Sequence, residues 1–123
     1  SYGAIFKHPE YEHSKYTFEI ADADQLIRWF DEYEQESGRA LESNLVFPAF
    51  DYVLKCSHTF NLLDAGGAIS VSARAGYIGR VRSLAQRVCK LFLEERRKLG
   101  FPLMKDRSAA QLWVEQLAPK EAV

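Results

Sequence analysis

The chain of 123 residues suits one domain with its own core, since 47% of its residues are hydrophobic and 27% are charged. A formal net charge of -1 excludes a global field that would attract nucleic acid or an anionic membrane, so such binding would need a local patch. No apolar stretch approaches the roughly 20 residues that cross a bilayer, and no secretory signal opens the chain, which predicts a cytoplasmic protein without membrane attachment.

The cysteines and the first residue indicate the context of the chain. Cys56 and Cys89 lie among apolar neighbours and show no CxxC spacing, which favours two buried thiols over a metal site or a disulfide. The chain begins at Ser1 rather than at a methionine, so we expect it to be a piece of a larger protein.

Residues 1–21 carry polar and aromatic side chains without a clear period, and Pro9 interrupts them, which predicts an irregular arm. His8 and His13 flank two glutamates in this segment. Their spacing fits no compact zinc pattern, and no further ligand lies nearby in the sequence. We therefore expect solvated residues rather than a metal site.

The first long helix is predicted from about Ala23 to about Leu41. Asp22 is a suitable N-cap, and Gln25 follows it at the spacing of a capping box. Apolar residues that recur at helical intervals predict the buried face: Leu26, Ile27, Phe30, Tyr33, Ala40 and Leu41. The remaining surface of this helix is mainly acidic.

The second helix is predicted from about Pro48 to about Leu63. Pro48 suits the first helical position, because the N–H that a proline lacks has no partner there. The apolar stripe consists of Phe50, Val53, Leu54, Phe60 and Leu63, with Cys56 at its edge. The pair Gly66-Gly67 permits a positive φ and predicts the stop that follows the helix.

The third and longest helix is predicted from about Val71 to about Leu99, with Ser70 or Ser72 as its cap and Gly100 as its stop. Its apolar stripe consists of Ile78, Val81, Ala85, Val88, Phe92 and Leu99. Its polar surface is basic and would attract the acidic first helix if the two were adjacent, although exposed ion pairs contribute little to stability.

These elements predict an all-α fold, because no alternation typical of strands occurs. Short connections favour antiparallel neighbours, so we expect a small antiparallel helical bundle of three long helices. A shorter C-terminal helix is expected from about Arg107 to Leu117, in addition to the irregular N-terminal arm. The helical domain is expected over residues 22–104, and residues 105–123 are expected to form the C-terminal helix and tail.

No arrangement of residues predicts catalysis. Gly66-Gly67 lacks the lysine and the preceding strand of a phosphate-binding loop. Ser70 and Ser72 lack the flanking glycines of a nucleophile elbow. His58 has no identifiable partner that would make it a general base. We therefore predict no catalytic, cofactor-binding or metal-binding residue in this chain.

The basic surface of the third helix is the feature with most functional weight. One interpretation, which we favour, is a solvated face paired with the acidic helix. The other is a stripe that contacts phosphate groups, which position a nucleic acid without reading its sequence. The candidate contacts to RNA or to a partner protein are Arg74, Tyr77, Arg80, Arg82, Arg87 and Lys90.

Five blocks of sequence carry a family resemblance. They are FPAFDYVLK (47–55), SHTFNLLDA (57–65), GAISV (67–71), YIGRVR (77–82) and LGFPL (99–103). Two earlier stretches, YGAIF (2–6) and EHSKYTFE (12–19), follow the same pattern. In this order the blocks resemble the α subunit of bacterial glycyl-tRNA synthetase, over nearly the whole chain up to about Met104.

The resemblance implies a class II aminoacyl-tRNA synthetase that joins glycine to tRNA with ATP and Mg²⁺. In that family the catalytic domain precedes a helical domain, so residues 1–21 would connect the two parts. The motifs that bind ATP and glycine are missing, so the chain alone is expected to be inactive, with no cofactor of its own. Its expected partners are its own catalytic domain, the β subunit or a fused β part, and glycine tRNA, and residues 105–123 would begin a junction to a β part.

An alternative of a different class stays open: a stand-alone helical module that binds RNA or protein through Arg80, Arg82 and Arg87. The chain also departs from the family pattern at three positions. Gly66 stands where the family usually has an arginine, Ala73 where it usually has a glutamate, and Gly76 where a larger residue is common. Without a glutamate at position 73 the capping box of the third helix is incomplete, at a cost of about 1 kcal/mol.

Overall fold

The computed structural model describes residues 2–99, with side chains from residue 8 onward. The elements in chain order are α1 (Tyr2–Lys15), a π-helical turn η1 (Tyr16–Ile20), α2 (Ala23–Glu42), α3 (Val46–Ala65) and α4 (Val71–Lys98). No strand occurs within this range, which confirms the all-α prediction. The helix expected over residues 107–117 and the tail after it lie outside the described residues.

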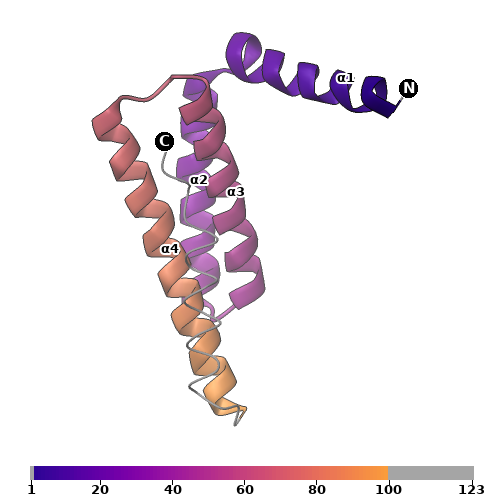
Figure 1. Ribbon diagram of the computed structural model, residues 1–123. Helices are drawn as coiled ribbons and strands as arrows, with labels where there is room; N and C mark the ends of the chain where they lie inside the picture. The colour runs from indigo at the N-terminus through magenta and orange to yellow at the C-terminus, as the bar shows by residue number, and fades with distance from the viewer. Residues whose placement is uncertain (1, 100–123) are drawn as a thin grey trace.

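Helices α2, α3 and α4 lie side by side as a bundle, and α1 projects away from its upper end (Figure 1). The most extensive contact is between α2 and α3, and α4 packs mainly on α3 and less on α2. Among residues 2–99, no helix combines the length and the apolarity that a membrane crossing needs.

The N-terminal arm differs from the prediction, because residues 2–20 are helical rather than irregular. Pro9 lies inside α1, and the helix then widens into the π-turn, in which the Ala21 N–H donates to the Tyr16 carbonyl over 2.7 Å. The physical reason for the error is packing. Only η1 contacts the bundle, through α3, and the described side chains of α1, residues 8–15, are exposed, so this part shows no buried stripe whose period a sequence could reveal.

Side-chain caps begin two helices at the expected places. The Asp22 carboxylate accepts the Gln25 backbone N–H over 3.3 Å at the start of α2. The Ser70 hydroxyl oxygen accepts the Ala73 backbone N–H over 3.2 Å, so Ser70 rather than Ser72 caps α4. Each of these bonds satisfies one of the donors that a helix start leaves without a partner.

Helix α3 begins at Val46, two residues before the predicted start. Pro48 is therefore the third helical residue, which is tolerated because none of the first three N–H groups has a partner within the helix. The first helical bond comes one residue later, from the Ala49 N–H to the Leu45 carbonyl over 3.2 Å.

The chain reverses twice through the same motif. After α2, Asn44 has a φ of 59°, and the Leu45 N–H donates to the Ala40 carbonyl over 2.9 Å. After α3, Gly67 has a φ of 71°, and the Ala68 N–H donates to the Leu63 carbonyl over 3.1 Å. Both turns are Schellman motifs, in which a left-handed residue lets the last carbonyls find donors.

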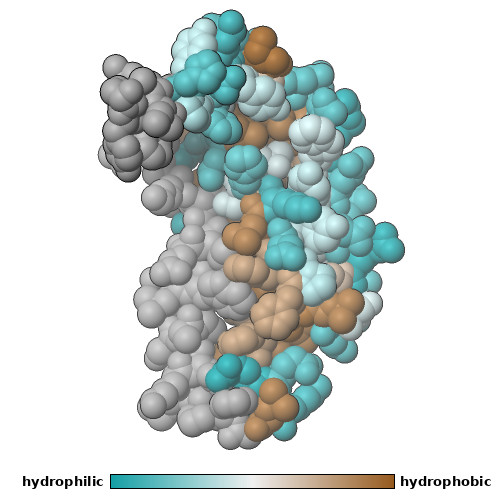
Figure 2. Space-filling view, turned by 90° about the vertical axis from the view of Figure 1, so that its right-hand side faces the viewer, coloured by the Kyte–Doolittle hydropathy of each residue, from teal (hydrophilic) through white to brown (hydrophobic). Residues whose placement is uncertain are grey.

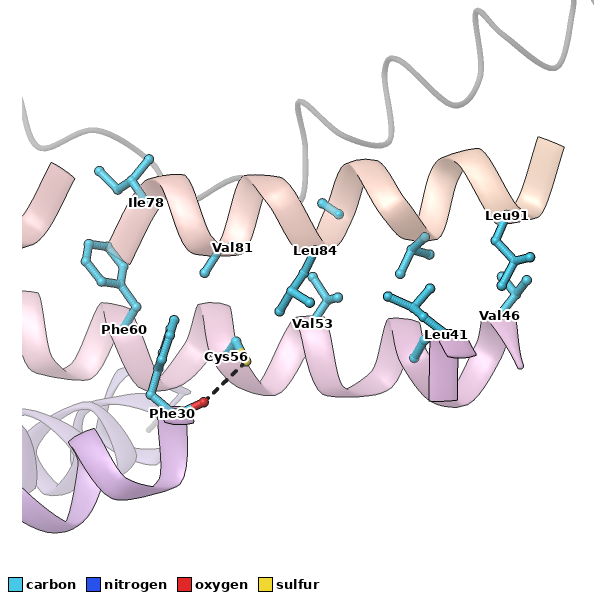
Figure 3. Packing of buried hydrophobic residues seen from close by; sticks show 13 residues of the cluster. Phe30, Leu41, Val46, Val53, Cys56, Phe60, Ile78, Val81, Leu84 and Leu91 are labelled. Atoms are coloured by element: carbon cyan, nitrogen blue, oxygen red, sulfur yellow. Dashed lines mark hydrogen bonds between the residues drawn. The ribbon is translucent and has the colours of Figure 1, made fainter. Parts of the chain in front are cut away.

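The core lies between α3 and α4 and is closed by α2 (Figure 3). Phe30 and Phe60 fill one end of it, and Leu41, Val46 and Leu91 fill the other. Two polar groups are accommodated in this apolar interior. The buried Ser37 hydroxyl of α2 donates to the Ala49 carbonyl of α3 over 2.9 Å, and the Cys56 thiol donates to the Phe30 carbonyl over 3.8 Å.

Helix α3 ends against the arm. Gly66 is its C-cap, and a Cβ added there would lie 3.1 Å from the Thr17 carbonyl oxygen and 3.3 Å from the Leu62 carbonyl oxygen. Both distances are shorter than ordinary van der Waals contact, so the absence of a side chain permits this approach of η1 to α3.

Substitution of Ser37 tests the α2–α3 contact. We expect Ser37→Ala to lower the free energy of unfolding by about 1 kcal/mol through the lost hydrogen bond. Ser37→Leu should cost more, about 2–3 kcal/mol, because no space exists for the added atoms. Urea denaturation followed by circular dichroism measures both values. An equal cost for the two variants would contradict the close packing described above.

Candidate interaction surfaces

Arg80 joins α4 to α2 through an ion-pair cluster. Its Nε donates to Glu34 over 2.9 Å, and one terminal nitrogen donates over 2.7 Å to Glu34 and over 2.7 Å to Asp31. The planar guanidinium thereby binds the Glu34 carboxylate with two parallel bonds. These hydrogen bonds, that to Glu34 first, raise the pKa of Arg80 further above its ordinary value despite partial burial.

Aromatic rings support the same guanidinium. Its central carbon lies 4.6 Å from the centroid of the Phe30 ring and 5.2 Å from that of Tyr77. The Phe30 and Tyr77 rings meet edge to face, with centroids 4.8 Å apart. The cluster therefore combines charge pairing with cation–π and aromatic contacts at the edge of the core.

The predicted contact residues fall into two groups. Arg74 binds Asp64 over 3.2 Å, Arg80 binds its two carboxylates, and Tyr77 packs among the Phe30 and Phe60 rings. These three side chains thus hold the bundle together. The other group is exposed on α4 and consists of Arg82, Arg87 and Lys90. The structure brings the first group to α2 and α3 and leaves the second exposed, although the Arg87 guanidinium reaches Gly38 of α2, so the basic stripe is not one continuous surface.

A groove on the opposite side of the molecule was missed by the sequence analysis. We call it the α2–α3 groove; it has a volume of about 930 Å³ and lies along α2 and α3, where η1 and the end of α1 close its upper part. Its lining residues are Glu12, His13, Tyr16, Leu26, Trp29, Tyr33, Asp51, Leu54, Lys55, His58, Thr59 and Leu62. On the α3 side of the molecule, apolar surface runs between hydrophilic side chains (Figure 2).

The groove is mainly apolar and partly solvated. Leu26 forms a buried floor, whereas Tyr16, Trp29 and Leu54 remain 38%, 37% and 43% exposed. Lys55 does not point freely outward, because its ammonium lies 4.8 Å from the centroid of the Tyr52 ring. A sequence signal existed: Leu26, Trp29 and Tyr33 recur at helical spacing, as do Leu54, His58 and Leu62. The prediction that Leu26 is buried and that Tyr33 packs on the core is confirmed, whereas Leu54 was wrongly assigned to the core because such stripes do not show which neighbour covers them.

The described residues include no arrangement suited to metal chemistry. No three His, Cys, Asp or Glu side chains between residues 8 and 99 gather closely enough to hold a metal ion. His8 pairs with Glu12 over 3.4 Å on the exposed surface of α1, and His58 lines the groove. The carboxylates of these described residues therefore do not fit a Mg²⁺ site.

Removal of Arg80 tests the ion-pair cluster. Arg80→Ala should lower the free energy of unfolding by about 1–2 kcal/mol, less than loss of a fully buried pair, because the Arg80 side chain is 37% exposed. The control is Lys90→Ala, because Lys90 is exposed on α4; this change should alter stability by less than about 0.5 kcal/mol. Chemical denaturation of both variants measures the difference, and equal values would contradict the structural role of Arg80.

We expect the free energy of unfolding to fall at high pH because of the buried Cys56 thiol. Burial, followed by the nearby Glu34 carboxylate, raises the pKa of Cys56 from 9.0 to about 12. Above pH 9 the unfolded thiol ionises while the folded one stays protonated, so stability should fall as the pH rises from 9 to 12. Urea midpoints at several pH values should fall more steeply for the parent chain than for Cys56→Ala. Parallel curves would show that Cys56 ionises equally in both states.

Comparison with known families agrees with the resemblance in the sequence. The family model described as glycyl-tRNA synthetase alpha subunit matches residues 1–97. The match includes the arm and all three helices of the bundle, almost to the end of α4. It thus covers four of the five sequence blocks and both earlier stretches. The chain belongs to the glycyl-tRNA synthetase alpha subunit family.

Proposed function

We propose that this chain is the C-terminal helical domain of a glycine–tRNA ligase and that it assembles the enzyme rather than catalysing the reaction. The parent enzyme, a class II synthetase, would charge tRNA with glycine using ATP and Mg²⁺ in a catalytic domain that precedes this segment. Family membership supports the ligase part of the proposal. The absence of a metal-binding cluster among residues 8–99 agrees with an active site elsewhere.

One observation carries the assembly role. The three-helix bundle buries its core between α2, α3 and α4, yet α2 and α3 keep a second, apolar groove that no described element covers. An exposed apolar patch that is rimmed by polar residues marks an interaction site or a ligand-binding groove. The partner we propose is the β subunit, or the corresponding part of a fused chain.

The basic side of α4 has a secondary place in this proposal. Arg82, Arg87 and Lys90 are the exposed members of the predicted contact set and would meet glycine tRNA or the β subunit. Arg74 and Arg80 are less suited to phosphate, because each already binds a carboxylate of its own bundle. A phosphate contact would have to break these pairs and leave the carboxylates without a partner.

Association with the β subunit tests the proposal. The purified chain, mixed with the β subunit of the same enzyme, should form a complex in sedimentation-velocity experiments. Glycine-dependent ATP–pyrophosphate exchange by the chain alone should be absent, because the reacting groups lie elsewhere. If the chain and the β subunit sediment independently at concentrations of about 10 μM, far above a typical specific Kd, the assembly role is rejected.

A further inference from the structure

The α2–α3 groove has the length of a short helix. Along α3 it extends from Asp51 to Leu62, which corresponds to about 16 Å or three helical turns. Apolar side chains stand on both walls: Trp29 and Tyr33 on α2, and Leu54 on α3. A partner helix that packs between two others presents apolar residues at intervals of three and four, and these walls offer the matching surface.

Charge is unequally distributed between the two sides of the molecule. Residues 2–65 contain twelve Asp or Glu against five Lys or Arg, whereas α4 contains eight Lys or Arg against two Asp or Glu. The groove is built entirely from the acidic part. Glu12 lies at its upper rim and Asp51 at its lower end, and the Lys55 ammonium is engaged with the Tyr52 ring.

This charge distribution favours some binding partners of the α2–α3 groove over others. Trp29 and Tyr16 could stack on bases, but the phosphates of a bound RNA would face the carboxylates of the rim, with Lys55 as the one Lys or Arg of the lining set. A second copy of the chain offers basic charge on α4, but the outward side of α4 carries small residues such as Gly76, Gly79 and Ser83. These residues cannot fill an apolar groove of this volume.

We propose that the α2–α3 groove binds an amphipathic α-helix of the β subunit, with apolar residues facing Trp29 and Leu54 and basic residues flanking them. The inference rests on the proposed function, since it names the surface through which assembly occurs. The apolar contacts hold the helix, and the charges at Glu12 and Asp51 fix its orientation and speed its association.

Two synthetic peptides probe the groove directly. Both are 15-residue helices with the same leucine stripe, and their flanks carry either lysine or glutamate. The reporter is the fluorescence of Trp29 in the full chain with Trp113→Phe, which leaves Trp29 as the one tryptophan. We expect the lysine-flanked peptide to bind at least about tenfold more tightly, with the difference shrinking at high salt. Equal affinities, or preference for the glutamate-flanked peptide, would overturn the inference.

Variants locate the binding site. Leu54→Glu places a charge on the groove wall and should weaken binding of the lysine-flanked peptide and of the β subunit at least about tenfold. Val71→Glu is the matched control, because Val71 is 89% exposed and lies outside the groove. This variant should bind the peptide and the β subunit with affinities within about twofold of those of the parent chain. The double variant Glu12→Lys with Asp51→Lys should reverse the preference between the peptides. Circular dichroism establishes that each variant is folded.

The same experiments separate binding at the groove from assembly with the β subunit. If the β subunit binds Leu54→Glu and Val71→Glu equally, assembly stands and the groove is not its site. If the β subunit does not bind, but the lysine-flanked peptide binds and Leu54→Glu weakens that binding, the proposed assembly with the β subunit is rejected. The groove then still prefers a basic amphipathic helix. If the chain forms dimers that Leu54→Glu abolishes, the occupant is a second copy, and the inference is overturned.

Discussion

The contact of Arg80 with Glu34 and Asp31 determines how α4 sits on the rest of the bundle. Helix α4 packs mainly on α3, and its contact with α2 is the smallest among the three bundle helices. Arg80 spans this contact with three hydrogen bonds, while its flat guanidinium lies against Phe30 and Tyr77. Because the group binds carboxylates through its nitrogens and also lies against aromatic rings, neither a lysine nor a shorter cation would reproduce the geometry.

This contact also helps to explain why charge is distributed unequally between the two sides of the molecule. The guanidinium neutralises two of the carboxylates of α2 at the α4 interface, so the acidic surplus that remains lies on the outer side of α2 and on α3. The same arrangement uses Arg80 and Arg74 within the fold and leaves Arg87 and Lys90 exposed. The nearly zero net charge thus conceals an acidic side, which carries the α2–α3 groove, and a basic side on α4.

The sequence predicted the elements whose ends are set by local chemistry. Asp22 and Ser70 are caps, and Gly67 is a left-handed stop, so α2 and α4 and the end of α3 lie close to their predicted places. The start of α3 was wrong by two residues because Leu45 provides no side-chain cap, and Pro48 is compatible with any position in the first turn.

Features that depend on three-dimensional neighbours could not be predicted in this way. The attraction between the acidic and basic helices was expected, but the choice of Glu34 and Asp31 as partners depends on the rotation of α2 against α4. Leu54 was assigned to the core because helical spacing reveals an apolar stripe and not what covers it. Helix α1 was not recognised, since its described side chains, residues 8–15, are all exposed and form no buried stripe.

The contact at Gly66 links this position to the upper wall of the α2–α3 groove. The arm meets the bundle through the backbone of η1, and the Thr17 carbonyl approaches Gly66 too closely for any side chain to fit without movement. The residues just before Thr17 form the upper wall of the α2–α3 groove. A side chain at position 66 would require the Thr17 carbonyl to move by a few tenths of an ångström. A substitution at this position, which does not line the groove, can therefore alter the groove's upper wall.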